Sequence, residues 1–325
     1  MASFRFLRFT FIIFLSVSVR AQQNPPEIFF HPDTLRSLVA VLAADSMQGR
    51  FTGSAGCAKA ARFIAGEFEK AGVLPVAGND RYFMPVTKKW ANVVAALKGT
   101  TKPQEFVIIS AHYDHIGTIY TDADLVANRG GRKGDKVYNG ANDDASGIAA
   151  VISLAKYFAS IGNNPRTILF VAFAGEELGM LGSKDFAGRF KPDSIVAVIN
   201  IEMIGREDKK GSHPYITGAD YSNLLSILND RLRQFDPIKY GDQFFEPYEL
   251  GLFDRSDNYP FALRGIPAHS VLATGDNDQY YHSLSDEIST LNFEFMSEVV
   301  RAVALSCRGL VNGEDTPKRI QAKNL

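Results

Sequence analysis

The chain has 325 residues, of which 46% are hydrophobic, and this is enough to bury the core of one large globular domain. Its formal net charge is -1, with 35 Lys and Arg residues against 36 Asp and Glu residues. The sequence therefore has no basic excess that favours nucleic-acid binding and no acidic excess that favours disorder. It contains no internal repeat and no low-complexity tract.

The first 21 residues have the pattern of a secretory signal peptide. Arg5 and Arg8 form a basic start, and the apolar run that follows is short for a membrane span. Ala21 is a small residue before the polar sequence QQNPPE. This order predicts removal of residues 1–21 and export of the chain, either to a periplasm or out of the cell. An uncleaved membrane anchor is the alternative interpretation.

Predicted helices and strands alternate along the rest of the chain. Continuous apolar strands between amphipathic helices predict an α/β fold with a central mixed, mostly parallel sheet flanked by helices on both faces. Ser54 has the character of an N-cap, and Gly72 and Gly162 are expected to end helices. In chain order, we expect a helix at 54–72, strands at 92–97 and 106–111, a helix at 145–162, strands at 167–174 and 195–201, a helix at 222–235, a strand at 268–274 and a helix at 292–310.

The sequence excludes three classes of site. The polar loop at 122–140 is glycine-rich, but it lacks the Lys-Ser/Thr ending of a phosphate-binding loop. The chain has no G-x-S-x-G motif, which excludes the usual serine hydrolase. Cys57 and Cys307 are too few for a metal-binding cysteine cluster. In an exported protein these two residues form either one disulfide or two buried thiols.

Histidines and carboxylates follow the predicted strands and precede one helix. Each group alone is more often structural than functional, but together they indicate a metal or catalytic site. Because ligands bind beyond the carboxyl ends of strands in open α/β sheets, we expect the groups to meet at one edge. The residues are His112, Asp114 and His115 after the strand at 106–111, Asp143 and Asp144 before the helix at 145–162, Glu176 and Glu177, Glu202, and His282 with Asp286.

Imidazole and carboxylate groups form a ligand set that suits zinc. Two metal ions that lie close together need a carboxylate between them, and a further carboxylate must take the proton of the attacking water. The adjacent residues Glu176 and Glu177 fit such a division, since one can bind metal while the other acts as the base.

With these residues, the chain resembles the M28 family of zinc aminopeptidases from about residue 30 to residue 308. The motifs that carry the resemblance are AHYDHIG, NGANDDASG, AGEELGMLGS, NIEMIGR, SDNYPF and YYHSLSD, and LAADSMQGRFTGSAG resembles the usual start of the family. The resemblance implies a zinc-dependent exopeptidase fold, of the phosphorylase/hydrolase-like kind. The stretch between the helix at 54–72 and His112 is too short for the protease-associated domain that many members carry, so residues 22–325 are expected to form a single catalytic domain.

The resemblance also implies two Zn²⁺ ions per chain. His112 and Glu202 would bind the first ion, Glu177 and His282 would bind the second, and Asp143 would bridge both. Most members have Asp where this chain has Glu202, whose carboxylate lies one methylene further out. Either the strand recedes slightly to accommodate it, or the first site binds metal more weakly. Some glutaminyl cyclases of this fold work with one zinc, so single-metal function is an open alternative.

Four further residues receive roles from the resemblance. Glu176 would be the catalytic general base and acid. Asp114, the second catalytic residue, would orient the ring of the neighbouring metal-binding histidine. Asp286 would hold the free ring nitrogen of His282, and His115 is expected either to support the site or to be structural.

The resemblance implies an exported metallo-aminopeptidase that acts on peptides with a free N-terminus, using a zinc-activated water and a glutamate base. No nucleic acid and no membrane span after signal removal are expected. The alternatives are a glutaminyl-peptide cyclase-like acyltransferase, a carboxypeptidase or aminoacylase in which Arg206 or Arg255 grips a substrate carboxylate, and a non-catalytic domain. Tyr280 or Tyr281 would stabilise the oxyanion. The aromatic stretch at 244–261 either accepts apolar substrate side chains or belongs to the core.

Overall fold

The computed structural model describes residues 26–76, 81–120, 130–241, 243–248, 251–275, 278–321, 323 and 325. The predicted signal peptide at 1–21 lies outside the described residues, as does most of the first half of the predicted polar loop at 122–140.

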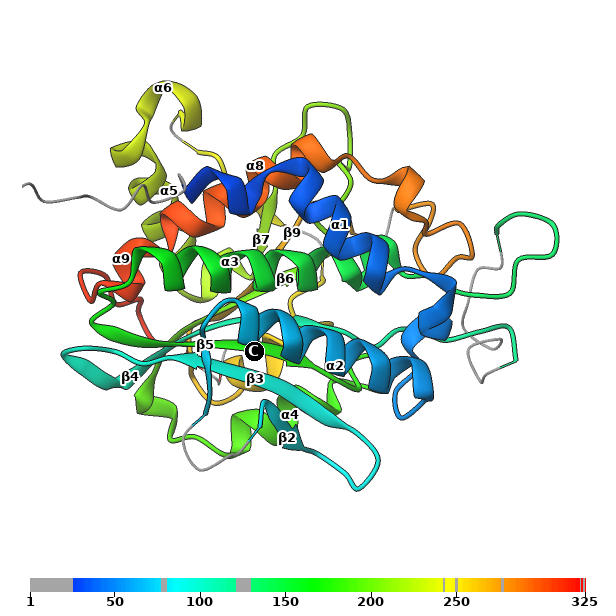
Figure 1. Ribbon diagram of the computed structural model, residues 1–325. Helices are drawn as coiled ribbons and strands as arrows, with labels where there is room; N and C mark the ends of the chain where they lie inside the picture. The colour runs from blue at the N-terminus through cyan, green and yellow to red at the C-terminus, as the bar shows by residue number, and fades with distance from the viewer. Residues whose placement is uncertain are drawn as a thin grey trace, which may run out of the picture.

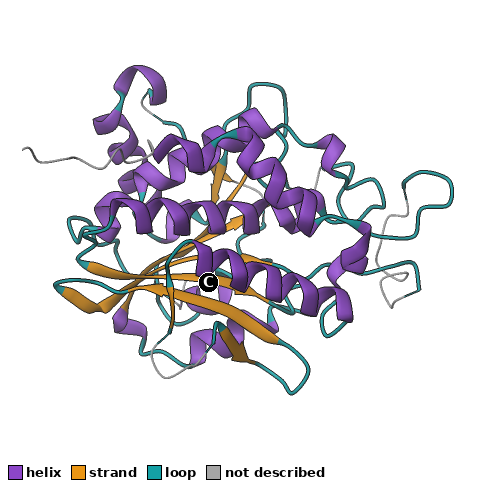
Figure 2. Cartoon of the chain, viewed as in Figure 1, coloured by secondary structure: helices purple, strands orange, loops and turns teal. Residues whose placement is uncertain are grey.

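In the part of the chain that the structure describes, one mixed sheet of nine strands forms the centre of the molecule (Figures 1 and 2). The strand order is β1-β3-β5-β4-β6-β9-β7-β8, and β2 pairs with β3. Strands β5, β4, β6 and β9 are parallel, whereas β3 and β7 join them antiparallel on either side. The strands are β1 (Leu74–Pro75), β2 (Phe83–Pro85), β3 (Ala91–Leu97), β4 (Lys102–His112), β5 (Arg166–Phe173), β6 (Ile195–Glu202), β7 (Tyr215–Thr217), β8 (Glu246–Tyr248) and β9 (Ala268–Leu272).

Helices cover both faces of the sheet, as the continuous apolar strands predict. Every residue of β5 is buried, and its side chains alternate between two cores. Phe170 joins the core under α1 (Pro32–Leu42), α2 (Ala55–Lys70), α3 (Gly147–Ile161), α5 (Leu224–Phe235), α6 (Pro237–Tyr240), α8 (Phe293–Ser306) and α9 (Arg308–Val311). Leu169 and Val171 join the core under α4 (Leu181–Gly188) and α7 (Tyr259–Ala262), and Figure 1 shows α4 across the sheet from α2 and α3. The predicted fold class is confirmed.

The predicted helix ends have the expected local chemistry. The Ser54 side chain accepts a hydrogen bond from the backbone N–H of Cys57 and so caps α2. Gly72 and Gly162 follow α2 and α3 with φ values of +73° and +57°, a conformation that glycine adopts with little strain. The closing helix predicted at 292–310 divides at Cys307 into α8 and α9.

Helix α3 is the central helix of the larger core. With the π-helical turn η4 (Ala141–Ser146) before it, it forms the one segment of the described chain that is long and apolar enough to cross a membrane. Most of this segment is buried inside the protein, as in the core helix of a globular domain. Cys57 and Cys307 are both buried free thiols, so the structure agrees with the two-thiol alternative.

Candidate metal centre

The predicted site residues gather at the carboxyl ends of the central parallel strands. His112 is the last residue of β4 and Glu202 is the last residue of β6. Glu176 and Glu177 follow β5, which ends at Phe173. Because these strands are parallel, their ends lie at the same edge of the sheet, as the sequence predicts. The turn η4 supplies the central residue, Asp143.

Asp143 lies between two sets of imidazole groups. Its Oδ1 atom is 3.1 Å from Nε2 of His112. Its Oδ2 atom is 3.4 Å from Nε2 of His282 and 3.7 Å from Nδ1 of His115. The two oxygens of one carboxylate therefore face different ligand groups, which is the arrangement that a bridging carboxylate requires.

Glu177 completes the group on the Oδ2 side of Asp143. Its Oε1 atom is 2.8 Å from Nδ1 of His115, and its Oε2 atom is 3.0 Å from Nε2 of His282. One ligand atom each from His115, Asp143, Glu177 and His282 lies within 4.8 Å of all the others. The structure thus brings together three of the predicted metal ligands, and it adds His115, for which the sequence suggested only a supporting or structural part.

The donor atoms fit a zinc ion. The buried Nε2 atom of His112 forms no hydrogen bond of good geometry among the described residues, and it lies 3.1 Å from Oδ1 of Asp143. Nδ1 of His112 lies 3.1 Å from the backbone oxygen of Asp114, so the opposite ring nitrogen points into the centre as a lone-pair donor. Nitrogen donors next to carboxylate oxygens form the set that zinc prefers.

The pKa values divide the carboxylates into two kinds. Burial and Asp143 disfavour ionisation of Glu177, but the hydrogen bonds of His115 and His282 outweigh them and lower its pKa to about 2. Burial also opposes the charge of His282, yet Asp143 and Glu177 raise its pKa to about 10. Glu177 and His282 are therefore held in their charged forms by each other.

Three further carboxyl groups have raised pKa values, whereas Asp143, despite its burial, has a pKa that the surrounding histidines lower well below the ordinary value. Burial is the largest cause for Glu176, Glu202 and Asp257, and neighbouring carboxylates add to it, while His112 opposes it. The pKa is about 7 for Glu202 and about 7 for Asp257, and that of Glu176 is well above its ordinary value. The carboxyl groups of the centre outnumber its imidazoles, and a divalent cation bound among them would favour their charged forms.

Asp114 holds the site in a different way from the one the sequence suggested. Its backbone oxygen, rather than its carboxylate, is within hydrogen-bonding distance of the His112 ring. Its carboxylate accepts hydrogen bonds from the hydroxyl of Thr52 at 2.6 Å and from the backbone N–H of Glu176 at 3.2 Å. Asp114 therefore positions both His112, a candidate metal ligand, and Glu176, the candidate base.

The suggested bond between Asp286 and His282 is not formed. Asp286 instead accepts hydrogen bonds from the backbone N–H groups of Asn142 and Asp143. It also pairs with Arg206 at 2.8 Å, and Arg206 forms a second ion pair with Asp278. Arg206 is thus engaged within the fold, which removes it as the group that grips a substrate carboxylate.

The sequence reasoning missed the role of Arg50, which is 1% exposed. Among the described residues, its guanidinium donates hydrogen bonds to backbone oxygens, at 2.6–2.9 Å for four of them and 3.5 Å for Asp143. The other acceptors are Leu42, Tyr113, Asn139 and Gly140. Arg50 belongs to the motif LAADSMQGRFTGSAG, which carries part of the family resemblance. A single arginine in the sequence does not, however, indicate that its side chain will be buried.

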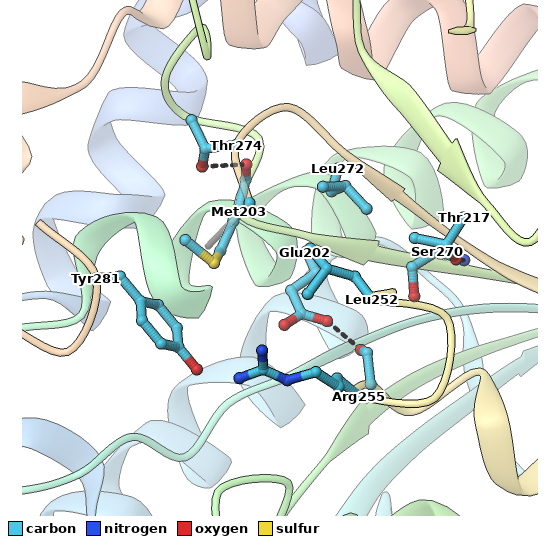
Figure 3. A pocket seen from close by; sticks show the side chains of 11 residues that line it. Glu202, Met203, Thr217, Leu252, Arg255, Ser270, Leu272, Thr274 and Tyr281 are labelled. Carbon is cyan, nitrogen blue, oxygen red and sulfur yellow. Dashed lines mark hydrogen bonds between the residues drawn. The ribbon is translucent and has the colours of Figure 1, made fainter. Parts of the chain in front are cut away.

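Tyr281 rather than Tyr280 lies at the centre. The Tyr281 ring stacks on the ring of His282 with 3.9 Å between centroids, whereas Tyr280 lies under the guanidinium of Arg206. Tyr281 also lines a small pocket with Glu202, which we call the Glu202 pocket (Figure 3). Burial and the nearby carboxylates raise the pKa of Tyr281, so its hydroxyl keeps its proton.

Comparisons with known proteins agree with this geometry. A profile of peptidase family M28 matches residues 92–306. A probable zinc metalloprotease of Pyrenophora tritici-repentis is 33% identical over 280 residues, which cover 74% of this chain and 61% of that protein. The chain thus spans less than two thirds of the length of this relative.

Two solved structures share the fold. One is BSAP, a zinc aminopeptidase from Bacillus subtilis, with a TM-score of 0.67 and 16% identity over 88% of this chain and 97% of that chain. The other is a glutaminyl cyclase from Porphyromonas gingivalis, with a TM-score of 0.64 and 17% identity over 87% of this chain and 99% of that chain. At these identities the likeness concerns the fold and does not choose between the two chemistries.

Proposed function

The chain belongs to peptidase family M28, and from this premise we propose that it is an exported zinc-dependent aminopeptidase that removes residues from the free N-terminus of peptides. The observation that carries the proposal is the position of Asp143, whose two oxygens face His112 on one side and His115 and His282 on the other. Glu176 lies in the same group of charges with a raised pKa. Residues 1–21 would be the signal peptide and residues 22–325 a single catalytic domain.

Two zinc ions would be held by five side chains. His112 and Glu202 would bind one ion, Glu177 and His282 the other, and Asp143 both. His115, whose Nδ1 atom contacts Glu177, would support the second ion or join its ligands. When bound, zinc polarises the scissile carbonyl and makes a water molecule more acidic.

Glu176 would carry out the proton transfers. Its raised pKa suits a group that accepts a proton from the attacking water and then donates it to the leaving amine. The hydrogen bond from the backbone N–H of Glu176 to the carboxylate of Asp114 fixes the backbone from which the Glu176 side chain extends. The hydroxyl of Tyr281 would donate a hydrogen bond to the oxyanion. The carboxylate of Glu177 or Glu202 would accept a hydrogen bond from the substrate's α-amine.

The experiment that tests this proposal combines zinc content with substrate choice. We would measure zinc per chain by elemental analysis of the mature protein, and hydrolysis of matched free and N-acetylated aminoacyl anilides. Zinc near two per chain with activity on the free-amine set alone supports an aminopeptidase. Release of acetate from N-acetylated amino acids with a free carboxylate would indicate an aminoacylase. Absence of hydrolysis after zinc is restored, with cyclisation of N-terminal glutamine, would indicate a cyclase.

A further inference from the structure

The Glu202 pocket adjoins the metal centre and is built from five segments of the chain, one of which is β7 with Thr217. Glu202 and Met203 come from the end of β6, Leu252 and Arg255 from the loop before α7, Leu272 from β9, and Tyr281 from the loop after β9. Because Glu202 belongs to both the pocket and the metal centre, a side chain next to the scissile carbonyl can enter this pocket. In an aminopeptidase this is the side chain of the N-terminal residue.

The threonine and serine hydroxyl groups in the pocket wall are already engaged within the fold. Thr217 accepts a hydrogen bond from the backbone N–H of Ser270, and the Ser270 hydroxyl donates to Asn258 at 2.9 Å. Thr274 accepts a hydrogen bond from the side-chain amide of Asn142 at 3.0 Å. These groups therefore build the wall, whereas Met203, Leu252 and Leu272 give it apolar surface.

Arg255 is the only cationic side chain among the described residues that line the pocket. Figure 3 shows its guanidinium between the carboxylate of Glu202 and the hydroxyl of Tyr281. Arg255 is exposed to solvent, but its backbone is fixed, because the next residue, Ser256, is buried and donates a hydrogen bond to Glu202. A guanidinium has five N–H donors, enough to serve neighbours within the protein and a substrate carboxylate together.

The carboxyl groups around the pocket make Arg255 important for the binding of an acidic substrate side chain. The centre beside it contains the buried or half-buried carboxyl groups of Asp143, Glu177, Glu202 and Asp257. The zinc ions proposed for the centre would be held by the first three of these carboxylates, so a negative side chain in the pocket needs a cationic partner of its own. A guanidinium binds a carboxylate in a fixed, two-pronged geometry.

We propose that Arg255 is the specificity-determining residue of the Glu202 pocket and that the preferred substrates are peptides whose N-terminal residue is Glu or Asp. This inference rests on the proposed aminopeptidase function. It differs from the expectation that the aromatic stretch at 244–261 selects apolar side chains. In this pocket the methylene groups of an acidic side chain contact the apolar wall, and its carboxylate pairs with Arg255.

The test compares isosteric substrates on the zinc-loaded enzyme. We would measure kcat/KM for the p-nitroanilides of Glu, Gln, Leu and Lys. We expect Glu to exceed Gln by at least about tenfold, since these side chains differ in charge and scarcely in size. The substitution Arg255→Met is expected to abolish that ratio while hydrolysis of the Leu substrate continues. Arg255→Glu is expected to favour Lys. The matched control is Arg308→Met, because Arg308 is an exposed arginine on α9 outside the pocket.

A binding measurement gives a second readout that does not depend on turnover. Calorimetric titration is expected to show tighter binding of free glutamate than of glutamine to the wild type, and no such difference in Arg255→Met. Hydrolysis of the Leu substrate with an unchanged Glu-to-Gln ratio in Arg255→Met would overturn this inference and leave the aminopeptidase function standing. Loss of zinc in both Arg255→Met and Arg255→Lys would overturn it too, since Arg255 would then serve Glu202. Failure to hydrolyse any free-amine substrate would overturn both proposals.

Discussion

At the scale of single residues, Glu176 and Glu177 are neighbours in the chain, but their surroundings shift their pKa values in opposite directions. Glu177 contacts two histidines, and its pKa falls to about 2. Glu176 has no such partner among the described residues, and burial with the nearby carboxylates raises its pKa. A permanently ionised carboxylate suits metal binding, whereas one that holds a proton suits acid-base catalysis.

The substitution Glu176→Gln tests this division. Glutamine has nearly the same size but cannot carry the transferred proton, so kcat is expected to fall by about 10²–10⁴-fold. Zinc content, measured by elemental analysis, is expected to stay at the wild-type level. Glu177→Gln is the matched control and is expected to lose zinc. Turnover retained in Glu176→Gln would show that another group acts as the base.

A second prediction concerns Glu202, where the common residue of the family is Asp. Glu202→Asp is expected to keep or raise the zinc occupancy of the site proposed for His112 and residue 202. The measurement is the zinc content of the protein during dialysis against a chelator. The Ser256 hydroxyl donates a hydrogen bond to Glu202 in the structure. A fall in zinc content would therefore mean that the local backbone is adapted to the longer side chain, and Ser256→Ala would identify the contribution of that bond.

The residue-scale prediction from sequence succeeded for groups that follow apolar strands, because a strand end fixes where the next side chain lies. His112, Glu177 and Glu202 were found in this way. The partner of His115 was not identified and that of Asp286 was predicted wrongly, because their partners come from segments far away in the chain. His115 contacts Glu177, and Asp286 holds the backbone of η4.

At the scale of elements, Arg50 connects the parts that carry the metal ligands. It binds carbonyls at the end of α1, in the loop after β4 and in the loop before η4. These hydrogen bonds are buried, and a buried backbone carbonyl needs a hydrogen-bond donor. Arg50 thereby sets the distance between His112, at the end of β4, and Asp143, in η4.

The substitution Arg50→Lys keeps the charge but loses the planar group with its several donors. It is expected to lower the free energy of unfolding by about 3 kcal/mol in urea titrations, because carbonyls lose their partners. It is also expected to weaken zinc binding, measured by competition with a chelator. Arg166→Lys is the matched control, because Arg166 is equally buried and binds the carbonyls of Leu310 and Asp315 far from the centre. Equal zinc affinity in both variants would contradict the positioning role of Arg50.

The elements themselves were predicted where they are long and apolar. Strands β4, β5 and β6 and helices α2 and α3 all appear where the sequence places them. Strands β1, β2, β7 and β8 have only two or three residues, so no periodicity marks them. The turn η4 was not foreseen, because its shape depends on Asp286 and Arg50 rather than on its own sequence.

At the scale of the whole molecule, buried His269 makes stability depend on pH. Burial lowers its pKa to about 4, whereas its ordinary value in the unfolded chain is 6.5. Above pH 6.5 the residue is neutral in both states. As the pH falls from 6.5 towards 4, the unfolded chain takes up the proton first, so the folded state loses up to about 3 kcal/mol of stability from this residue.

This prediction is checked with the metal-free protein and His269→Gln in urea between pH 4 and pH 8. The difference in unfolding free energy between the two is expected to be constant above pH 6.5 and to shrink as the pH falls. His213→Gln is the control, since His213 is exposed and hydrogen-bonds only to the carbonyl of Phe244 in the described part of the chain. A difference that does not change with pH would mean that His269 titrates normally in the folded state.

The position of the metal ligands along the chain has a consequence for biosynthesis. The first ligand, His112, closes β4, and the last, His282, comes after β9. A growing polypeptide that has not yet passed residue 282 therefore holds an incomplete set of donors, however much of the sheet it has formed. The proposed site is therefore complete only once residue 282 has been synthesised, and the metal supply at that stage would bear on which ion fills it.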